Sequence, residues 1–411
     1  MINKLLNTIK NDTLVKQNII LFAGTMTLNV LNYFYHFAVG RILGPADYGI
    51  LAVFFSIIYI LFAPVNTIQT ILTKFTADFI AKNETGKVAY LLKRSLQILG
   101  YISLLIFGIF FLFSPQIAKF LLIDNINYVR LFSIAFLVIF VTAVTRGFLQ
   151  GYQNFKILSA SLILEGAAKL SIALLLIYFG FNLYGAIVAI SLALLFSFLF
   201  TFYYLQKLIP KDAIKVDSSA IYAYSLPVLI TMMVITAMYT FDVILVKHFF
   251  EPVTAGLYAA ASLLGKIIFF ASYSFSWVMF PKIAEAYSKG EEYKHIFRKS
   301  LLLVSILVAI AVFVYWLIPD LVVGLLFGVE YLAVTDLIAP FGLAMGLFSI
   351  AFIVTNYYLS TNRTKFIYVL AAFAILEIAA IWFFHQTLEQ VVNILLATML
   401  ALVISLFIVR K

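Results

Sequence analysis

The chain has 411 residues, of which 64% are hydrophobic and 11% are charged. A soluble domain has about 45–50% apolar and about 25% charged residues. So few charges cannot cover soluble domains, which indicates that lipid surrounds most of the chain. The chain has no cysteine, which excludes disulfides, Cys-ligated metal sites and Cys nucleophiles. We attribute the net charge of +10 to basic loops at the cytoplasmic membrane surface rather than to nucleic-acid binding.

The first element in chain order is a basic segment, 1–17, in which apolar residues recur at helical spacing: Ile2, Leu5, Leu6 and Ile9. This pattern predicts a short amphipathic helix that lies on the membrane surface. The apolar stretch that follows is too long for the hydrophobic region of a cleavable signal, so we expect a retained spanning helix there.

Twelve stretches are long and apolar enough to cross a bilayer, which takes about 20 residues each. In chain order they cover 18–40, 48–72, 97–115, 128–150, 157–180, 183–206, 222–247, 255–280, 300–318, 333–359, 366–385 and 390–409. The short stretches at 116–130 and 319–335 mix apolar and charged residues and are expected at the membrane interface.

The basic residues orient these spans. With the N-terminus inside, 22 of the 28 Lys and Arg residues fall on the cytoplasmic side and only 4 on the outer side. This asymmetry predicts that both termini are cytoplasmic, which requires an even number of spans. The sequence therefore predicts an all-α, multi-pass protein of the cytoplasmic membrane without an attached soluble domain.

The two halves of the chain resemble each other. Three pairs of segments match in the same order: RILGPADYGILA at 41–52 with HFFEPVTAGLYA at 248–259, then 79–96 with 284–301, and 163–168 with 375–380. Each half holds six spans, so both enter the membrane from the same side. We predict two parallel six-helix lobes, 1–215 and 216–411, around a central cavity, an arrangement typical of transporters. The alternative is a duplicated scaffold without a transport role.

Polar residues within the spans predict the lining of that cavity, because such residues usually face a cavity or a partner helix. The first span carries polar residues on one face, and the second carries Asn66, Thr67, Gln69 and Thr70 after Pro64. We expect the substrate path to be lined by Asn29, Asn32, His36, Gln69, Asp242 and Lys266. For the uncharged residues, hydrogen bonding between helices is the alternative explanation.

Ionisable residues in the spans suggest ion coupling. Glu165 and Lys169 are four residues apart, which favours an ion pair within one helix over a transport role. Glu377 occupies the repeat position of Glu165 but has no lysine four residues on. Asp242, Glu377 and Glu165 are therefore our candidates for coupling to H⁺ or Na⁺.

Three cations are candidates for binding an anionic headgroup at the mouths of the path. Arg41 and Lys247 end the first and seventh spans on the outer side, and Arg146 lies near the inner end of the fourth span. Snorkelling to the interface explains such residues equally well. The sequence has no GxxxxGK[ST] and no HExxH motif, and its four histidines suggest no catalytic arrangement. We therefore expect that the protein is not an enzyme and that it binds no cofactor.

One segment resembles a known family. The run RILGPADYG, Arg41–Gly49, is similar to the LGPxxYG element after the first span of polysaccharide-biosynthesis membrane proteins. These are the O-antigen and lipid-linked oligosaccharide flippases of the multidrug/oligosaccharidyl-lipid/polysaccharide exporter superfamily. Ser225-Leu226-Pro227 and the turn from Gln150-Gly151 to Lys156 also resemble them. The resemblance implies alternating access of two lobes and the flipping of a lipid-linked oligosaccharide, with that saccharide and membrane lipids as partners.

The chain departs from the family pattern in two ways. Many relatives have two further C-terminal helices, whereas this sequence stops at Lys411, and few Arg or Lys residues fall in the expected cavity. Pro64 and Pro227 are expected to permit bending, because proline removes a helix hydrogen bond. The alternatives are a cation-coupled multidrug antiporter of the same fold, a membrane polymerase or ligase, and a scaffold for glycosyltransferases. The sequence leaves the glycan, the lipid carrier and the oligomeric state open.

Overall fold

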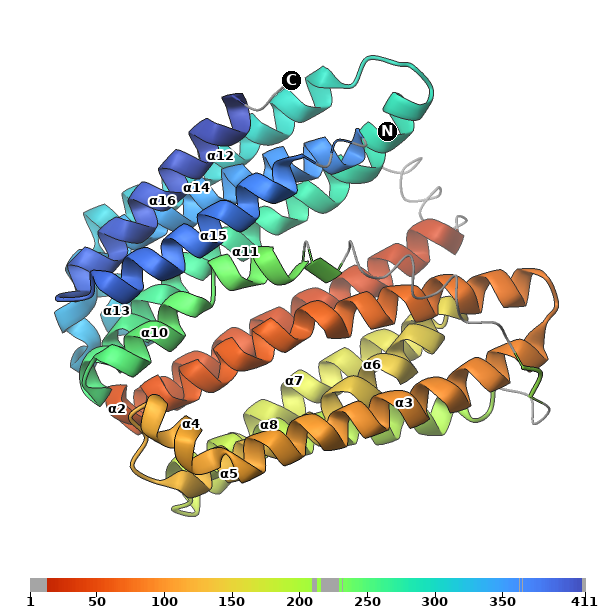
Figure 1. Ribbon diagram of the computed structural model, residues 1–411, viewed down its shortest axis with the longest axis horizontal. Helices are drawn as coiled ribbons and strands as arrows, with labels where there is room; N and C mark the ends of the chain where they lie inside the picture. Colours follow the sequence, from red (N-terminus) through yellow and green to blue (C-terminus); the bar gives the residue numbers. More distant parts are fainter. Residues whose placement is uncertain are drawn as a thin grey trace, which may run out of the picture. The chain divides into compact units, whose positions relative to one another are not determined.

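The computed structural model describes residues 13–208, 213–215, 229–230, 232–361, 363 and 365–408. The predicted surface helix in 1–17 falls almost entirely outside the described residues, as do the predicted bend at Pro227 and the basic C-terminal pair Arg410 and Lys411. All regular elements in the described part of the chain are helices (Figure 1), which confirms the predicted all-α fold.

The membrane-spanning helices agree with the predicted number. Among the described residues, ten helices are long and apolar enough to cross a membrane, or up to eleven with the bent pair Met232–Met238 and Phe241–Phe249. The first, Ile19–Ala81, has 63 residues. At 1.5 Å per residue it is about three times as long as the ~30 Å hydrocarbon core is thick. It therefore contains two of the predicted spans, which brings the total to eleven, or to twelve with the bent pair.

The chain forms two compact units. One consists of Met1–Leu43 and Leu61–Ile230, and the other of Gly44–Ile60 and Thr231–Lys411. The second unit thus begins near the predicted division between 215 and 216. It also includes 44–60, a segment that the sequence places in the N-terminal lobe.

The first unit is a bundle of apolar helices built around α6. Both ends of α2 (Thr13–Ala81) belong to it, and its other helices are α3 (Thr85–Leu112), α4 (Ser114–Phe120), α5 (Ile126–Ser133), α6 (Phe136–Gly151), α7 (Phe155–Tyr178) and α8 (Asn182–Leu205). Side chains of Asn125 and Asn154 cap α5 and α7 by accepting hydrogen bonds from backbone N–H groups. α6 contacts α3, α7 and α8, and most of its residues are buried.

The second unit repeats this order. Its helices are α10 (Phe241–Phe249), α11 (Pro252–Ser288), α12 (Lys294–Leu317), α13 (Pro319–Leu326), the 3₁₀ helix η1 (Val329–Val334), α14 (Thr335–Ser360), α15 (Phe366–Phe383) and α16 (Leu388–Ile408). α14 is the buried centre and contacts α12 and α16, as α6 contacts α3 and α8 (Figure 1). The predicted duplication therefore appears as the same packing in both units.

The break inside α2 falls at Gly44. Its backbone angles, φ 75° and ψ 175°, are non-helical, and only glycine adopts them without strain. Pro64, where the sequence predicts a bend, keeps helical angles.

Immediately after the break, the segment 44–60 crosses α11 closely. A Cβ atom on Gly49 would lie 2.9 Å from the backbone nitrogen of Gly256, and one on Gly256 would lie 1.7 Å from the carbonyl oxygen of Pro45. The first matching pair of segments from the two repeats thus packs together inside the second unit. Beside it, the buried ring of Tyr48 contacts Phe327 and Tyr331.

Candidate functional site

A buried group of ionisable side chains lies within the second unit. Asp242 is in the first turn of α10, where the positive end of the helix dipole favours a carboxylate. Its Oδ2 accepts hydrogen bonds from the hydroxyls of Tyr258 at 3.0 Å and Ser262 at 3.3 Å. The Nζ of Lys266 lies 3.9 Å from Asp242 Oδ1. The three partners follow one another every four residues, so one face of α11 holds the aspartate.

Glu377, on α15, is the third charged member of this group. Its side chain is 1% exposed, and it interacts electrostatically with both Asp242 and Lys266. Neither of its carboxylate oxygens has a hydrogen-bond partner among the described residues. With all three groups ionised, the cluster has one negative charge in excess. A buried charge without a partner is costly, so neutralising one of the two carboxyl groups would balance the cluster.

A second charged group lies inside the first unit and contains an ion pair. Arg146 on α6 donates from Nη2 to Glu165 Oε2 on α7 at 2.6 Å and to the Ser197 hydroxyl on α8 at 2.7 Å. Both charged side chains are 13% exposed. The cation therefore ties three helices together, and the ion pair that the structure shows for Glu165 is with Arg146 rather than with Lys169.

Lys169 joins α7 to the polar face of the first span. Its Nζ donates to Asn32 Oδ1 at 2.6 Å and lies 5.0 Å from the centre of the Tyr35 ring. The Tyr35 hydroxyl in turn donates to the backbone oxygen of Ala186 on α8. Polar residues of the first span therefore contribute to packing within the first unit.

The remaining predicted site residues differ in exposure. The amide of Gln69 donates to Gln150 at 3.0 Å. Asn29 is half-buried and His36 is buried, whereas Arg41 is exposed and Lys247 is 1% exposed. The structure thus brings Asp242, Lys266 and Glu377 together in one unit, and Asn32, Glu165 and Arg146 in the other. Their roles in substrate binding and ion coupling stay predictions.

Sequence reasoning missed two kinds of residue. Tyr258 and Ser262 belong to the Asp242 cluster. They precede Lys266 by eight and four residues, a helical spacing that indicates one shared helix face. It also missed Lys74 and Asp78, which continue the polar positions Asn66 and Thr70 along one face of α2. The sequence assigns Lys74 to the cytoplasmic basic residues, and the helix shows that it belongs to this face.

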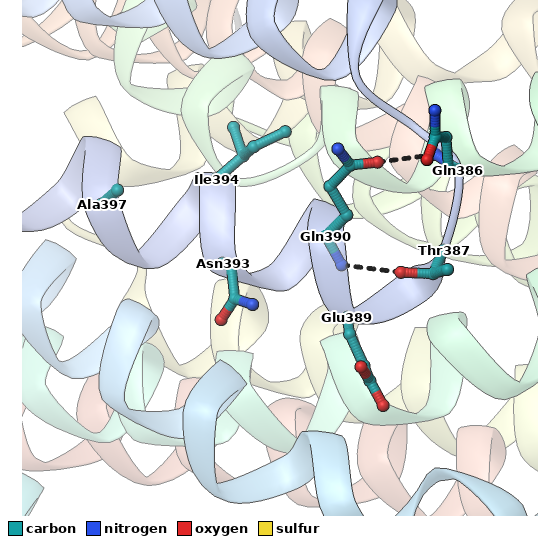
Figure 2. Close-up of a pocket in the computed structure, with 7 residues that line it drawn as sticks. All are labelled: Gln386, Thr387, Glu389, Gln390, Asn393, Ile394 and Ala397. Atoms are coloured by element: carbon teal, nitrogen blue, oxygen red, sulfur yellow. Dashed lines mark hydrogen bonds between the residues drawn. The ribbon is translucent and has the colours of Figure 1, made fainter.

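A shallow polar hollow of about 510 Å³ lies at the start of α16 (Figure 2). Its lining is Gln386, Thr387, Glu389, Gln390, Asn393, Ile394 and Ala397. The Gln386 N–H donates to Gln390 Oε1 at 2.7 Å, and the Gln390 N–H donates to the Thr387 hydroxyl at 3.1 Å. These polar groups cap the first turn of the helix, so we do not assign a site here.

Comparison with known sequences identifies the family. Residues 38–336 match the sequence model of a family described as polysaccharide biosynthesis protein, which is well over half of the chain. The chain belongs to this family. The resemblance inferred from the RILGPADYG segment is therefore confirmed.

Individual relatives of this polysaccharide biosynthesis protein are distant. Stage V sporulation protein B of Bacillus subtilis is 29% identical over 171 residues, 39% of this chain and 32% of the relative. An uncharacterized membrane protein of Methanocaldococcus jannaschii is 24% identical over 296 residues, 66% of this chain and 68% of the relative. The match to the Bacillus protein thus spans about a third of that protein's length.

Solved structures establish the fold. A multidrug resistance MATE family transporter of the MOP superfamily in an inward-facing conformation has a TM-score of 0.81 at 13% identity, covering 96% of this chain and 99% of its own. The lipid II flippase MurJ in an inward closed conformation has a TM-score of 0.73 at 13% identity, covering 96% of this chain and 88% of its own. The chain therefore has the two-repeat helical fold of these membrane proteins.

Proposed function

We propose that the protein flips a lipid-linked saccharide, a polysaccharide precursor, across the cytoplasmic membrane by alternating access, with both chain termini cytoplasmic. The observation that carries this proposal is the buried cluster of Asp242, Lys266 and Glu377 inside the second unit, a bundle of mostly apolar helices. Ionisable groups inside a membrane are costly and mark substrate or ion pathways. Membership in the polysaccharide biosynthesis family supports a saccharide as the substrate, and the likeness to MurJ supports a fold suited to a lipid-linked one.

The same cluster is our candidate for energy coupling. Because the cluster has one excess negative charge, a proton or Na⁺ that neutralises Glu377 changes the electrostatic balance around Lys266. Release of that cation leaves a buried charge that favours a different packing of α10, α11 and α15. We therefore propose that cation binding at Glu377 couples ion flow to transport, and that Lys266 responds to it.

A reconstituted flipping assay tests the proposal. The protein is placed in vesicles that contain a lipid-linked oligosaccharide, and a membrane-impermeant glycosidase reports how much saccharide reaches the outer leaflet. We expect the wild type to accelerate flipping over protein-free vesicles, and Lys266→Ala and Glu377→Gln to slow it at equal protein amounts. Lys119→Ala, at an exposed position on α4, is the matched control. Wild-type vesicles that flip no faster than protein-free vesicles would overturn the proposal.

The multidrug antiporter is the less favourable alternative. Binding a cationic drug needs acidic groups that are not already neutralised. Of the three candidate carboxyl groups, Asp242 has Lys266 beside it and Glu165 is paired with Arg146, whereas neither oxygen of Glu377 has a hydrogen-bond partner among the described residues. A proton gradient that drives uptake of a cationic dye, with no effect on the saccharide, would favour the antiporter.

A further inference from the structure

The cytoplasmic half of the second span has a polar exposed face. Between residues 61 and 80 of α2, within the first unit, the exposed residues are Asn66, Thr70, Lys74 and Asp78. All the others in this stretch are buried or half-buried. The four recur every four residues and therefore form one stripe along the helix. We call them the α2 stripe.

Helices that face lipid look different. In α3, the exposed residues from 101 to 112 are all apolar or aromatic: Tyr101, Ile102, Leu104, Leu105, Ile109, Phe111 and Leu112. α12 likewise exposes only apolar or aromatic residues between 301 and 317. Both helices show what this chain presents to hydrocarbon. The α2 stripe has the opposite composition, so hydrocarbon does not cover it and water or a polar ligand does.

The stripe runs from the cytoplasm into the inner half of the membrane. α2 ends at Ala81, in the segment that the basic residues place on the cytoplasmic side. The predicted second span covers 48–72, so Lys74 and Asp78 lie on its cytoplasmic side. At 1.5 Å per residue, Asn66 lies about 9 Å along the helix from residue 72, short of the middle of a ~30 Å core. The stripe therefore joins the cytoplasm to the inner half of the bilayer.

The side chains of the stripe suit a saccharide that carries phosphate. The Asn66 amide makes no hydrogen bond with the described residues, and the Thr70 hydroxyl donates only to the backbone oxygen of Asn66. Amides and hydroxyls pair with sugar hydroxyls, and an ammonium group such as that of Lys74 pairs with phosphate.

We propose that the α2 stripe is the surface along which the phosphate-bearing saccharide headgroup of the substrate enters the membrane from the cytoplasm. This inference rests on the proposed flippase function and names the residues that contact the headgroup. It adds Asn66, Thr70, Lys74 and Asp78 to the path, and it places the path on the outside of the first unit rather than on the face where Asn32 and Lys169 are bonded.

Thiol labelling tests whether the stripe is wet. The chain has no cysteine, so each single-cysteine variant carries one reactive thiol. A membrane-impermeant maleimide is added to inside-out vesicles that contain Asn66→Cys, Thr70→Cys or Lys74→Cys. The controls are Leu105→Cys and Ile109→Cys, at exposed positions on α3. We expect the stripe variants to react at least tenfold faster than the controls. Equal, slow labelling of Asn66→Cys and Leu105→Cys would overturn the inference.

Protection by ligand tests the headgroup. Lipid-linked oligosaccharide with a diphosphate linkage is included in the vesicles, and labelling of Asn66→Cys and Lys74→Cys is expected to slow at least threefold. Fast labelling without protection, whatever the flipping assay shows, would overturn the headgroup assignment. Protection in vesicles that do not flip the saccharide would overturn the proposed function and leave the binding surface standing. Lys74→Met should lower the flipping rate, whereas Lys93→Met, at an exposed position on α3, should not.

Discussion

Substitution of Gly256 by alanine tests the close crossing between α11 and the 44–60 segment of α2. The new Cβ would lie 1.7 Å from the carbonyl oxygen of Pro45 and 2.4 Å from the carbonyl carbon. Both are backbone atoms, so no side-chain rotation relieves the overlap. Because non-bonded heavy atoms pack at about 3.5–4.0 Å, the two segments must separate by roughly 2 Å.

The cost of that separation follows from the packing around it. Overpacking in a core costs typically about 1–3 kcal/mol. The shift would also loosen the buried ring of Tyr48 from Phe327 and Tyr331, so we expect a value near the upper end, about 3 kcal/mol. For a unit of this size, one kcal/mol corresponds to about 2–4 °C, which gives a fall in Tm of roughly 6–12 °C.

Thermal unfolding of the purified protein in detergent measures this effect. The control is Gly108→Ala in α3, where a Cβ would meet nothing within 4 Å. Alanine is favoured over glycine in a helix interior by about 0.8–1.0 kcal/mol, so this variant should lose no stability. A Gly256→Ala protein that unfolds at the same temperature as Gly108→Ala would refute the argument from the close crossing.

Three further predictions follow from the contacts. Gly49→Ala should lower the unfolding stability by about 1–2 kcal/mol, which is less than for Gly256→Ala, because its Cβ would lie 2.9 Å from a backbone nitrogen. Thermal unfolding in detergent measures this loss. Glu165→Gln should cost about 3–5 kcal/mol in the same assay by leaving Arg146 buried without its partner, and the double change Arg146→Met with Glu165→Leu should recover most of the loss. Tyr258→Phe should lower the unfolding stability by about 1.5–3 kcal/mol in the same assay, because it removes the hydrogen bond to Asp242. The exposed fraction of a probe attached to α3, which belongs to the other unit, should not change.

Hydropathy was enough to predict the helical fold and the approximate number of spans. A spanning helix is defined by its length and by the solvent around it, both of which are local properties of the sequence. The duplication was also readable, because Pro45 and Gly49 match Pro252 and Gly256 at equivalent positions. What the sequence did not predict is that these two motifs touch each other, since equivalence by repeat carries no information about contact.

Partners of buried charges were harder to predict. Spacing suggests that Glu165 pairs with Lys169 on the same helix, whereas the ion pair in the structure joins α7 to Arg146 on α6. Contacts between helices depend on their rotation and depth in the bundle, and a periodic pattern does not fix either. The exposed stripe on α2 was missed for a related reason: polarity was visible in the sequence, but which of the polar residues stay uncovered was not.

The two units have the same order of helices but differ in how their buried glutamates are paired, and we relate this difference to function. Glu165 and Glu377 occupy equivalent repeat positions, yet the first is bonded to Arg146 at 2.6 Å and the second has no hydrogen-bond partner among the described residues. A fully paired charge has little reason to change its state during transport. A buried charge without a partner is costly unless a cation neutralises it. This difference is why our proposal places cation binding at Glu377 in the second unit and headgroup contact on the α2 stripe of the first.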